Sequence, residues 1–200
     1  MKLEDCFRFL AARRTDQLVI TSAGQSGNAW WDITRDSDAT FHLSASMSLS
    51  TMFASGLALA LPQARFWAFM GDGAFCMNPG ALMVERQMNL SNLTHFLVSN
   101  RHYGATSNAP LPNKDHNDYA AIARGMGLER VYSFDSLAAM EQQFDAAVLG
   151  NAKGHTFVVL EVETHTGRRF EQAPDGTELK YRFGRHVEKL TGCDVFGYRV

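Results

Sequence analysis

Two short motifs with metal-binding side chains each follow a run of apolar residues. Gly71-Asp72-Gly73 follows the run RFWAFM, and Asn100 follows the run THFLVS. Carboxylate and amide oxygens are ligands that Mg²⁺ prefers. If the two runs are neighbouring parallel strands, both side chains can reach one cation, and the backbone oxygen of His102 can complete the set. The pairing is far more specific than Gly-Asp-Gly alone, which is common in turns.

The glycines of the first motif also suit a phosphate ligand. Glycine allows a backbone to approach a phosphate closely, and amide groups near the start of a helix attract anions. A cation held by Asp72 would bridge two phosphate groups. An unrelated nucleotide-binding protein is disfavoured, because the sequence contains neither Gly-x-Gly-x-x-Gly nor Gly-x-x-x-x-Gly-Lys-Ser/Thr.

The elements that must position these motifs alternate between helix and strand. The expected strands are Gln17–Thr21, Phe41–Leu43, Arg65–Met70, Thr94–Ser99 and Thr156–Val162. The expected helices are Leu3–Arg13, Ser48–Leu61, Pro79–Met88, Tyr119–Met126 and Ser136–Leu149, while Ser22–Asp38 reads as polar and glycine-bearing. This alternation predicts an α/β three-layer sandwich with a mostly parallel central sheet.

In such a sheet, ligands bind beyond the carboxyl ends of the strands. The residues that directly follow the expected strands are therefore the informative ones. They are Ser22–Gln25, Ser44–Ser48, Gly71–Phe75 and Asn100–Thr106.

The chain is expected to form one domain over residues 1–166, followed by an ordered tail over residues 167–200. The tail packs on the domain or on a partner subunit. Its basic residues are Arg168, Arg169, Lys180, Arg182 and Arg185. Glu171, Asp175, Glu178 and Glu188 are interleaved with them. A solvated or inter-subunit face is therefore favoured over an anion site.

Composition excludes several other classes of protein. The net charge of −2 over 200 residues disfavours a nucleic-acid-binding protein that works through a broad basic field. Three scattered cysteines do not make a disulfide framework, and the longest apolar stretches are too short to span a bilayer. We expect a cytoplasmic protein. The seven histidines lack metal-ligand spacing, and burial is favoured over metal ligation for His95.

The segments GDGAF and VSNRHYGAT together resemble the cofactor fingerprint of thiamine diphosphate enzymes. The sequence is most similar to the diphosphate-binding (beta) subunit of two-chain sulfopyruvate and phosphonopyruvate decarboxylases. FHLSASMSLSTMFASGLALALP is similar to that family's Gly-Ser-Met-Gly stretch and the small-residue helix that follows it. The resemblance covers roughly residues 1–165 and implies the thiamine diphosphate-binding fold.

The resemblance implies roles for individual residues. Asp72, Asn100 and the main-chain oxygen of His102 would ligate Mg²⁺, and the amides of Gly73 and Ala74 would contact the diphosphate. The full set of expected cofactor-binding residues is Ala45, Ser46, Met47, Gly71, Asp72, Gly73, Ala74, Phe75, Asn100, His102, Tyr103 and Gly104.

Met47 is the catalytic residue that the resemblance places on this chain. It would lie beneath the bent cofactor, and the carbonyl of Ala45 would accept a hydrogen bond from the pyrimidine amino group. Phe75 and Met77 would help to wall the pocket.

The sequence departs from the family pattern at three positions. Ala45 and Ser48 stand where the family has glycines, and the first change is tolerable because only the backbone of Ala45 is used. Thr106 stands where pyruvate-decarboxylase-type enzymes carry a catalytic glutamate. The two-chain decarboxylases also lack that acid, so this departure bears on the subtype of enzyme and does not exclude activity.

The implied function is that of a lyase subunit that decarboxylates a 2-oxo acid with thiamine diphosphate and Mg²⁺. The glutamate that activates the cofactor belongs to a separate pyrimidine-binding domain in this family, so we expect a partner subunit to supply it. Two alternatives stay open: a carboligase subunit, acyloin- or acetolactate-synthase-like, and a non-catalytic cofactor-binding module. Substrate identity, subunit stoichiometry and the purpose of the tail are not determined by the sequence.

Overall fold

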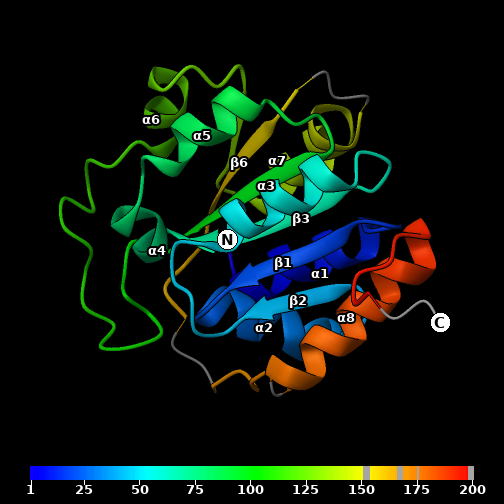
Figure 1. The fold of residues 1–200 in the computed structure, drawn as a ribbon. Coiled ribbons are helices and arrows are strands. Elements are labelled where there is room, and N and C mark those ends of the chain that lie inside the picture. Colours follow the sequence, from blue (N-terminus) through cyan, green and yellow to red (C-terminus); the bar gives the residue numbers. More distant parts are fainter. Residues whose placement is uncertain (151–153, 166–168, 175, 198–200) are drawn as a thin grey trace.

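A six-stranded, wholly parallel sheet forms the centre of the molecule (Figure 1). The computed structural model describes residues 1–150, 154–165, 169–174 and 176–197. The strands are β1 (Leu18–Ser22), β2 (Thr40–Leu43), β3 (Phe66–Gly71), β4 (Leu93–Ser99), β5 (Arg130–Phe134) and β6 (Thr156–Glu161). They lie in the order β2-β1-β3-β4-β6-β5. The central strands are buried along almost their whole length, as parallel strands covered on both faces must be.

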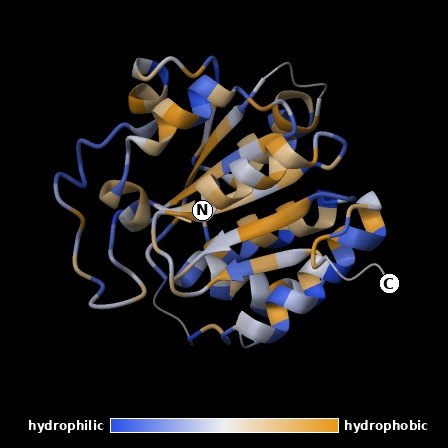
Figure 2. Ribbon diagram, viewed as in Figure 1, coloured by the Kyte–Doolittle hydropathy of each residue, from blue (hydrophilic) through white to orange (hydrophobic). Residues whose placement is uncertain are grey.

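Helices cover both faces of this sheet (Figure 1), which confirms the expected three-layer α/β fold. One face packs against α1 (Leu3–Arg13), α2 (Gln25–Thr34) and α7 (Leu137–Phe144). The other packs against α3 (Ser50–Ala60), α5 (Ala81–Met88), α6 (Tyr119–Gly125) and α8 (Gly176–Thr191). Figure 2 shows apolar residues along the strands, whereas the helices alternate between apolar and hydrophilic residues.

A continuous stack of aromatic rings fills the core on the first face. Phe69 lies 5.0 Å from the rings of Phe7, Trp30 and Phe96, measured between ring centroids. Phe144 of α7 stacks on Phe96 at 6.2 Å. These contacts fix α1, α2 and α7 against the strands whose ends carry the candidate site.

Five elements differ from the sequence expectation, α8 among them. The segment read as polar contains α2, because its buried face is built from small residues around Trp30 and lacks an aliphatic stripe. The short edge strand β5 and the six-residue helix α4 (Asp72–Met77) were not expected. The single helix expected over Ser136–Leu149 divides into α7 and a π-helical turn, η1 (Asp145–Leu149).

The C-terminal segment contains α8, which packs on the β2 edge of the sheet. Leu179, Phe183 and Val187 of α8 are buried, and the ring of Phe183 lies 5.5 Å from that of Phe41. The expected domain boundary between residues 166 and 167 lies outside the described residues, as does Arg168. No helix in the described part of the chain has the length and apolar character needed to cross a membrane.

Candidate cofactor site

A pocket opens at the carboxyl ends of four adjacent strands, β2, β1, β3 and β4. The chain leaves β1 toward β2 on one side and later leaves β3 toward β4 on the other, so the strand order reverses between β1 and β3. Ligands of open α/β sheets bind at such a reversal. The pocket is lined from all four segments that the sequence singled out, with Ala23–Ser26, Met47, Gly71–Ala74 and Asn100 among its residues. Its cavity measures about 220 Å³.

Asp72 occupies the floor of this pocket at the tip of β3. Its side chain is buried, with only 2% exposed. One carboxylate oxygen accepts a hydrogen bond from the Gly73 amide at 2.9 Å, and the other accepts one from the Arg101 amide at 2.7 Å. Burial raises the pKa of the Asp72 carboxyl above its usual value, although these amides oppose the shift.

Asn100 lies at the tip of β4, the strand next to β3. Its Oδ1 accepts a hydrogen bond from the His102 amide at 2.9 Å, and its Nδ2 donates to Oε1 of Gln25 at 3.2 Å. A Cβ at position 104 would lie 2.4 Å from that Gln25 oxygen and 2.8 Å from the Asn100 nitrogen, so a larger residue there would displace these two side-chain ends. The polar end of Asn100 is therefore held by its hydrogen bonds with His102 and Gln25.

Arg101 anchors the loop that follows the site. Its guanidinium pairs with Glu161 of β6 at 2.5 Å and donates to the carbonyls of Lys114 and Asn117 at 2.8 and 2.6 Å. Its φ of 64° places the backbone in the left-handed region, which a non-glycine residue adopts only at a cost. The sequence did not point to a role for this residue, because its partners are distant in the chain.

The loop after β2 presents Met47 to the pocket. Met47 lines the cavity and is 41% exposed, so its side chain has a free surface on which another group can rest. Ser48 has a φ of 66°, a conformation that glycine adopts without strain. This explains why a glycine would suit that position, as in the family that the sequence resembles. Ala45 is exposed and Ser46 half-buried, and neither lines the pocket.

Most of the expected cofactor-binding residues are brought together. Those that line the pocket are Met47, Gly71, Asp72, Gly73, Ala74, Asn100, His102, Tyr103 and Gly104. Phe75 instead lies in the core, with its ring against Tyr119 and Phe157, and Met77 is exposed outside the pocket lining. The sequence reasoning missed an apolar wall formed by Leu3, Val98 and Val162.

The residues at the pocket floor suit a hard divalent cation. Among the described residues, no lysine or arginine side chain forms an ion pair with the buried Asp72 carboxylate. A cation bound there would offset the cost of burying that charge. Asn100 lines the same pocket, and carboxylate and amide oxygens are of the type that Mg²⁺ prefers.

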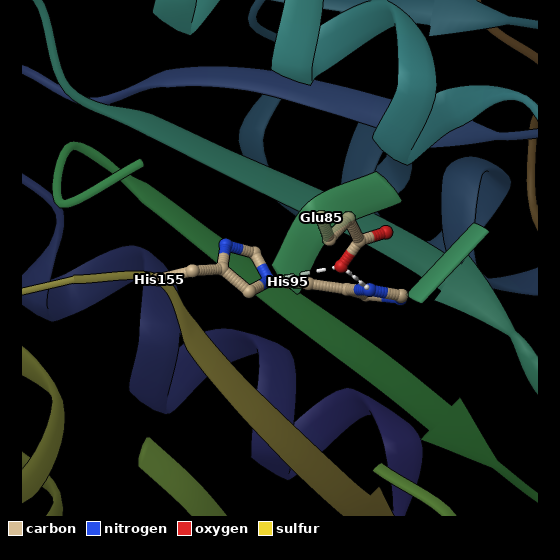
Figure 3. Close-up of side chains that lie close together, drawn as sticks. All are labelled: Glu85, His95 and His155. Atoms are coloured by element: carbon tan, nitrogen blue, oxygen red, sulfur yellow. Dashed lines mark hydrogen bonds and ion pairs between the residues drawn. The ribbon is translucent and has the colours of Figure 1, made fainter. Parts of the chain in front are cut away.

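A second cluster of ligand-type side chains lies away from this pocket, between α5, β4 and the start of β6 (Figure 3). Oε2 of Glu85 lies 2.9 Å from Nδ1 of His95 and 2.8 Å from Nε2 of His155. The carboxylate is thus between the two imidazole rings, close enough to pair with either ring when that ring is protonated. Burial opposes ionisation of Glu85, but the charge of His95 and the contacts with both rings outweigh it and lower its pKa. His95 is buried, as expected.

Comparison with known proteins agrees with this geometry. Residues 22–162 match the family model "Thiamine pyrophosphate enzyme, C-terminal TPP binding domain". The chain is 27% identical to the sulfopyruvate decarboxylase subunit beta of Methanococcus maripaludis, over 88% of this chain and 91% of that one. It is 26% identical to the sulfopyruvate decarboxylase of Methanosarcina acetivorans, over 95% of this chain but only 49% of that one.

The fold is similar to that of a solved enzyme, the thiamine diphosphate-dependent 4-hydroxybenzoylformate decarboxylase of Rhodococcus jostii RHA1. The TM-score is 0.66 at 16% sequence identity, over 84% of this chain and 33% of that one. This chain thus spans about a third of the length of the solved enzyme. The family model covers well over half of the present sequence, and its boundaries enclose the tips of β1 to β4 that build the pocket. The chain therefore belongs to the thiamine pyrophosphate enzyme family, of which it represents the C-terminal TPP-binding domain.

Proposed function

We propose that this chain is the diphosphate- and Mg²⁺-binding subunit of a two-chain decarboxylase that acts on a 2-oxo acid, with sulfopyruvate or phosphonopyruvate as the model substrate. The observation that carries the proposal is the placement of Asp72 and Asn100 at the tips of adjacent strands, in one pocket, in a chain of this family. Further support comes from the match to nearly the whole length of a relative named as a beta subunit.

Within the site, each residue has a defined task. Asp72, Asn100 and the backbone oxygen of His102 would hold Mg²⁺, and the amides of Gly73 and Ala74 would bind the diphosphate. Bound thiamine diphosphate supplies the electron sink that loss of carbon dioxide from a 2-oxo acid requires. Met47 would support the cofactor in its reactive shape. The apolar wall of Leu3, Val98 and Val162 excludes water. A dry pocket favours decarboxylation, because that step converts a charged group into neutral products.

A separate subunit would supply the pyrimidine-binding domain and the glutamate that activates the cofactor. The Methanosarcina relative is about twice as long as the part that this chain matches, so it contains a further segment of similar size. In the proposed enzyme, that contribution comes from the partner. The cytoplasmic location expected from the composition stays a prediction.

Co-purification with the partner subunit tests the proposal. The complex with thiamine diphosphate and Mg²⁺ is expected to release carbon dioxide from sulfopyruvate, whereas this chain alone is not. Turnover at enzymatic rates by the isolated chain would contradict the two-chain assignment. An acyloin product in place of an aldehyde would identify a carboligase, and cofactor binding without turnover of any 2-oxo acid would identify a non-catalytic module.

A further inference from the structure

A second cavity, of about 380 Å³, adjoins the cofactor pocket and shares part of its wall. Both cavities are lined by Gln25 and by the segment Gly104–Thr106. The second cavity extends from there toward the segment after β6, where Arg169 and Gln172 line it. The two cavities are therefore neighbouring parts of one larger site.

The described residues that line this second cavity are mostly polar. Arg169 contributes a guanidinium, and Asn28, Asn108 and Gln172 contribute side-chain amides. No aspartate or glutamate stands among the described residues that line the cavity. A guanidinium in the same cavity as neutral hydrogen-bond donors suits an oxyanion with several acceptor oxygens, such as a sulfonate, a phosphonate or a carboxylate.

Arg169 differs in its partners from Arg182 and Arg185, the other tail arginines among the described residues. Arg182 pairs with Asp38 at 2.7 Å and Glu178 at 3.3 Å, and Arg185 pairs with Glu188 at 2.6 Å. Arg182 and Arg185 are thus exposed and paired with acidic side chains, as expected for a solvated face. Within the described part of the chain, no carboxylate lies at ion-pair distance from Arg169. Its charge is therefore available to a ligand.

His165 and Phe170, which flank Arg169 in the sequence, contact each other, and His165 also contacts the body of the domain. The ring of His165 stacks on Phe170 with 4.3 Å between centroids, and its Nδ1 lies 3.2 Å from a carboxylate oxygen of Glu4 on α1. His165 and Phe170 also line the cavity. These contacts place His165 and Phe170 at the same cavity wall as Arg169.

We infer that Arg169 binds the second acidic group of the substrate and so selects 2-oxo acids that carry one. This inference rests on the proposed function, because the reacting end of such an acid would lie in the adjoining cofactor pocket. Thr106 lies at the junction of the two cavities. A substrate with acidic groups at both ends would therefore extend from one cavity into the other.

The test uses the complex with the partner subunit, loaded with thiamine diphosphate and Mg²⁺. Arg169→Gln is expected to raise the KM for sulfopyruvate about 10- to 100-fold, and to leave the KM for pyruvate, which lacks the sulfonate, within about twofold. Arg169→Lys should recover part of the loss, and Arg182→Gln is the matched control. An equal effect on both substrates, or none, overturns the inference.

Two binding measurements distinguish a substrate anion from the diphosphate of the cofactor. Titration calorimetry with 3-sulfopropanoate, a dianion that cannot be decarboxylated, is expected to show binding to the wild-type complex and loss of binding in Arg169→Gln. If no 2-oxo acid is turned over but the wild-type complex binds 3-sulfopropanoate and Arg169→Gln does not, the anion site is supported and the proposed function is wrong. If Arg169→Gln instead weakens thiamine diphosphate binding, the anion is the cofactor's diphosphate and the inference is wrong. Absence of both turnover and dianion binding in the wild-type complex overturns both.

Discussion

The carboxylate of Asp72 accepts a 2.7 Å hydrogen bond from the backbone amide of Arg101, 29 residues further along the chain. This bond joins the tips of β3 and β4. It also directs the chain after β4 so that Asn100 lies beside the same pocket. The residue that would hold the metal thus also organises the strand end that supplies the next ligand.

Asp72→Asn is expected to weaken Mg²⁺-dependent binding of thiamine diphosphate by about 100-fold or more, because a neutral amide replaces the only buried acid that lines the pocket in the described chain. Titration calorimetry on the complex with the partner subunit measures the change. Circular dichroism should show an unchanged fold. Asp115→Asn, at an exposed carboxylate, serves as the control. Unchanged affinity in Asp72→Asn would remove the metal assignment.

The strand ends were the part of the site that sequence could predict. Asp72 and Asn100 are recognisable because each has a metal-ligand side chain directly after an apolar run, and parallel strands place such positions at one edge. Leu3 and Val162 also line the pocket, but their residue types carry no signal of a site. Their role arises only from the way that distant segments pack.

The same limit explains what was missed in the fold. The helix α2 buries Trp30 with small residues, so it lacks the aliphatic periodicity that predicts a helix. Helix α8 does carry a helical signal, because Leu179, Phe183 and Val187 recur at four-residue spacing and form its buried face, although the many charged residues around them are also typical of a solvated tail. At Ser48, by contrast, the sequence did carry a signal. The family that the sequence resembles has glycine at this position, and the structure shows a positive φ there.

Arg101→Lys is expected to weaken cofactor binding about 10-fold although the positive charge is kept. Lysine cannot reproduce the planar fork that reaches Glu161 and two loop carbonyls at once. Hydrogen exchange over residues 112–118 should become faster in the variant. Arg86→Lys, which alters a single exposed ion pair, is the control. Faster exchange with unchanged affinity would show that the loop is not coupled to the site.

Met47→Ala is expected to lower kcat about 10- to 100-fold and to change the affinity for thiamine diphosphate by less than about threefold. The physical reason is that Met47 would hold a reactive geometry and contributes little to the contacts of the diphosphate. Steady-state kinetics and titration calorimetry on the complex measure the two effects separately. Met83→Ala, at an exposed methionine of α5, is the control. Loss of affinity for thiamine diphosphate with a normal kcat would show that Met47 does not hold the reactive geometry of the cofactor.

The stability of the chain should depend on pH through His42. Burial lowers the pKa of His42 to about 4, while the unfolded chain takes up this proton near pH 6.5. The unfolded state therefore binds more protons between these values, and stability is lost as the pH falls through that window. The loss attributable to His42 is about 3 kcal/mol.

Urea unfolding at pH 7 and pH 4 measures this effect in the wild type and in His42→Gln. The variant lacks the titrating ring, so its free energy of unfolding should fall less over the same interval. His116→Gln, at an exposed histidine, should behave as the wild type does. Parallel pH profiles for the wild type and His42→Gln would contradict the assignment.

Glu85→Gln is expected to lower the free energy of unfolding at pH 7 by about 3–5 kcal/mol, because it removes one partner from a buried charge cluster. Glu85, His95 and His155 are each no more than 2% exposed, so water cannot replace the lost contacts. Glu129→Gln removes an exposed partner of Arg86 and should cost no more than about 1 kcal/mol. Because the cluster ties α5 to β4 and to the start of β6, below the strand ends, its loss should leave the cofactor affinity of the folded complex unchanged. A loss of stability no larger than that of Glu129→Gln would show that the three side chains do not form an ion-paired cluster in solution.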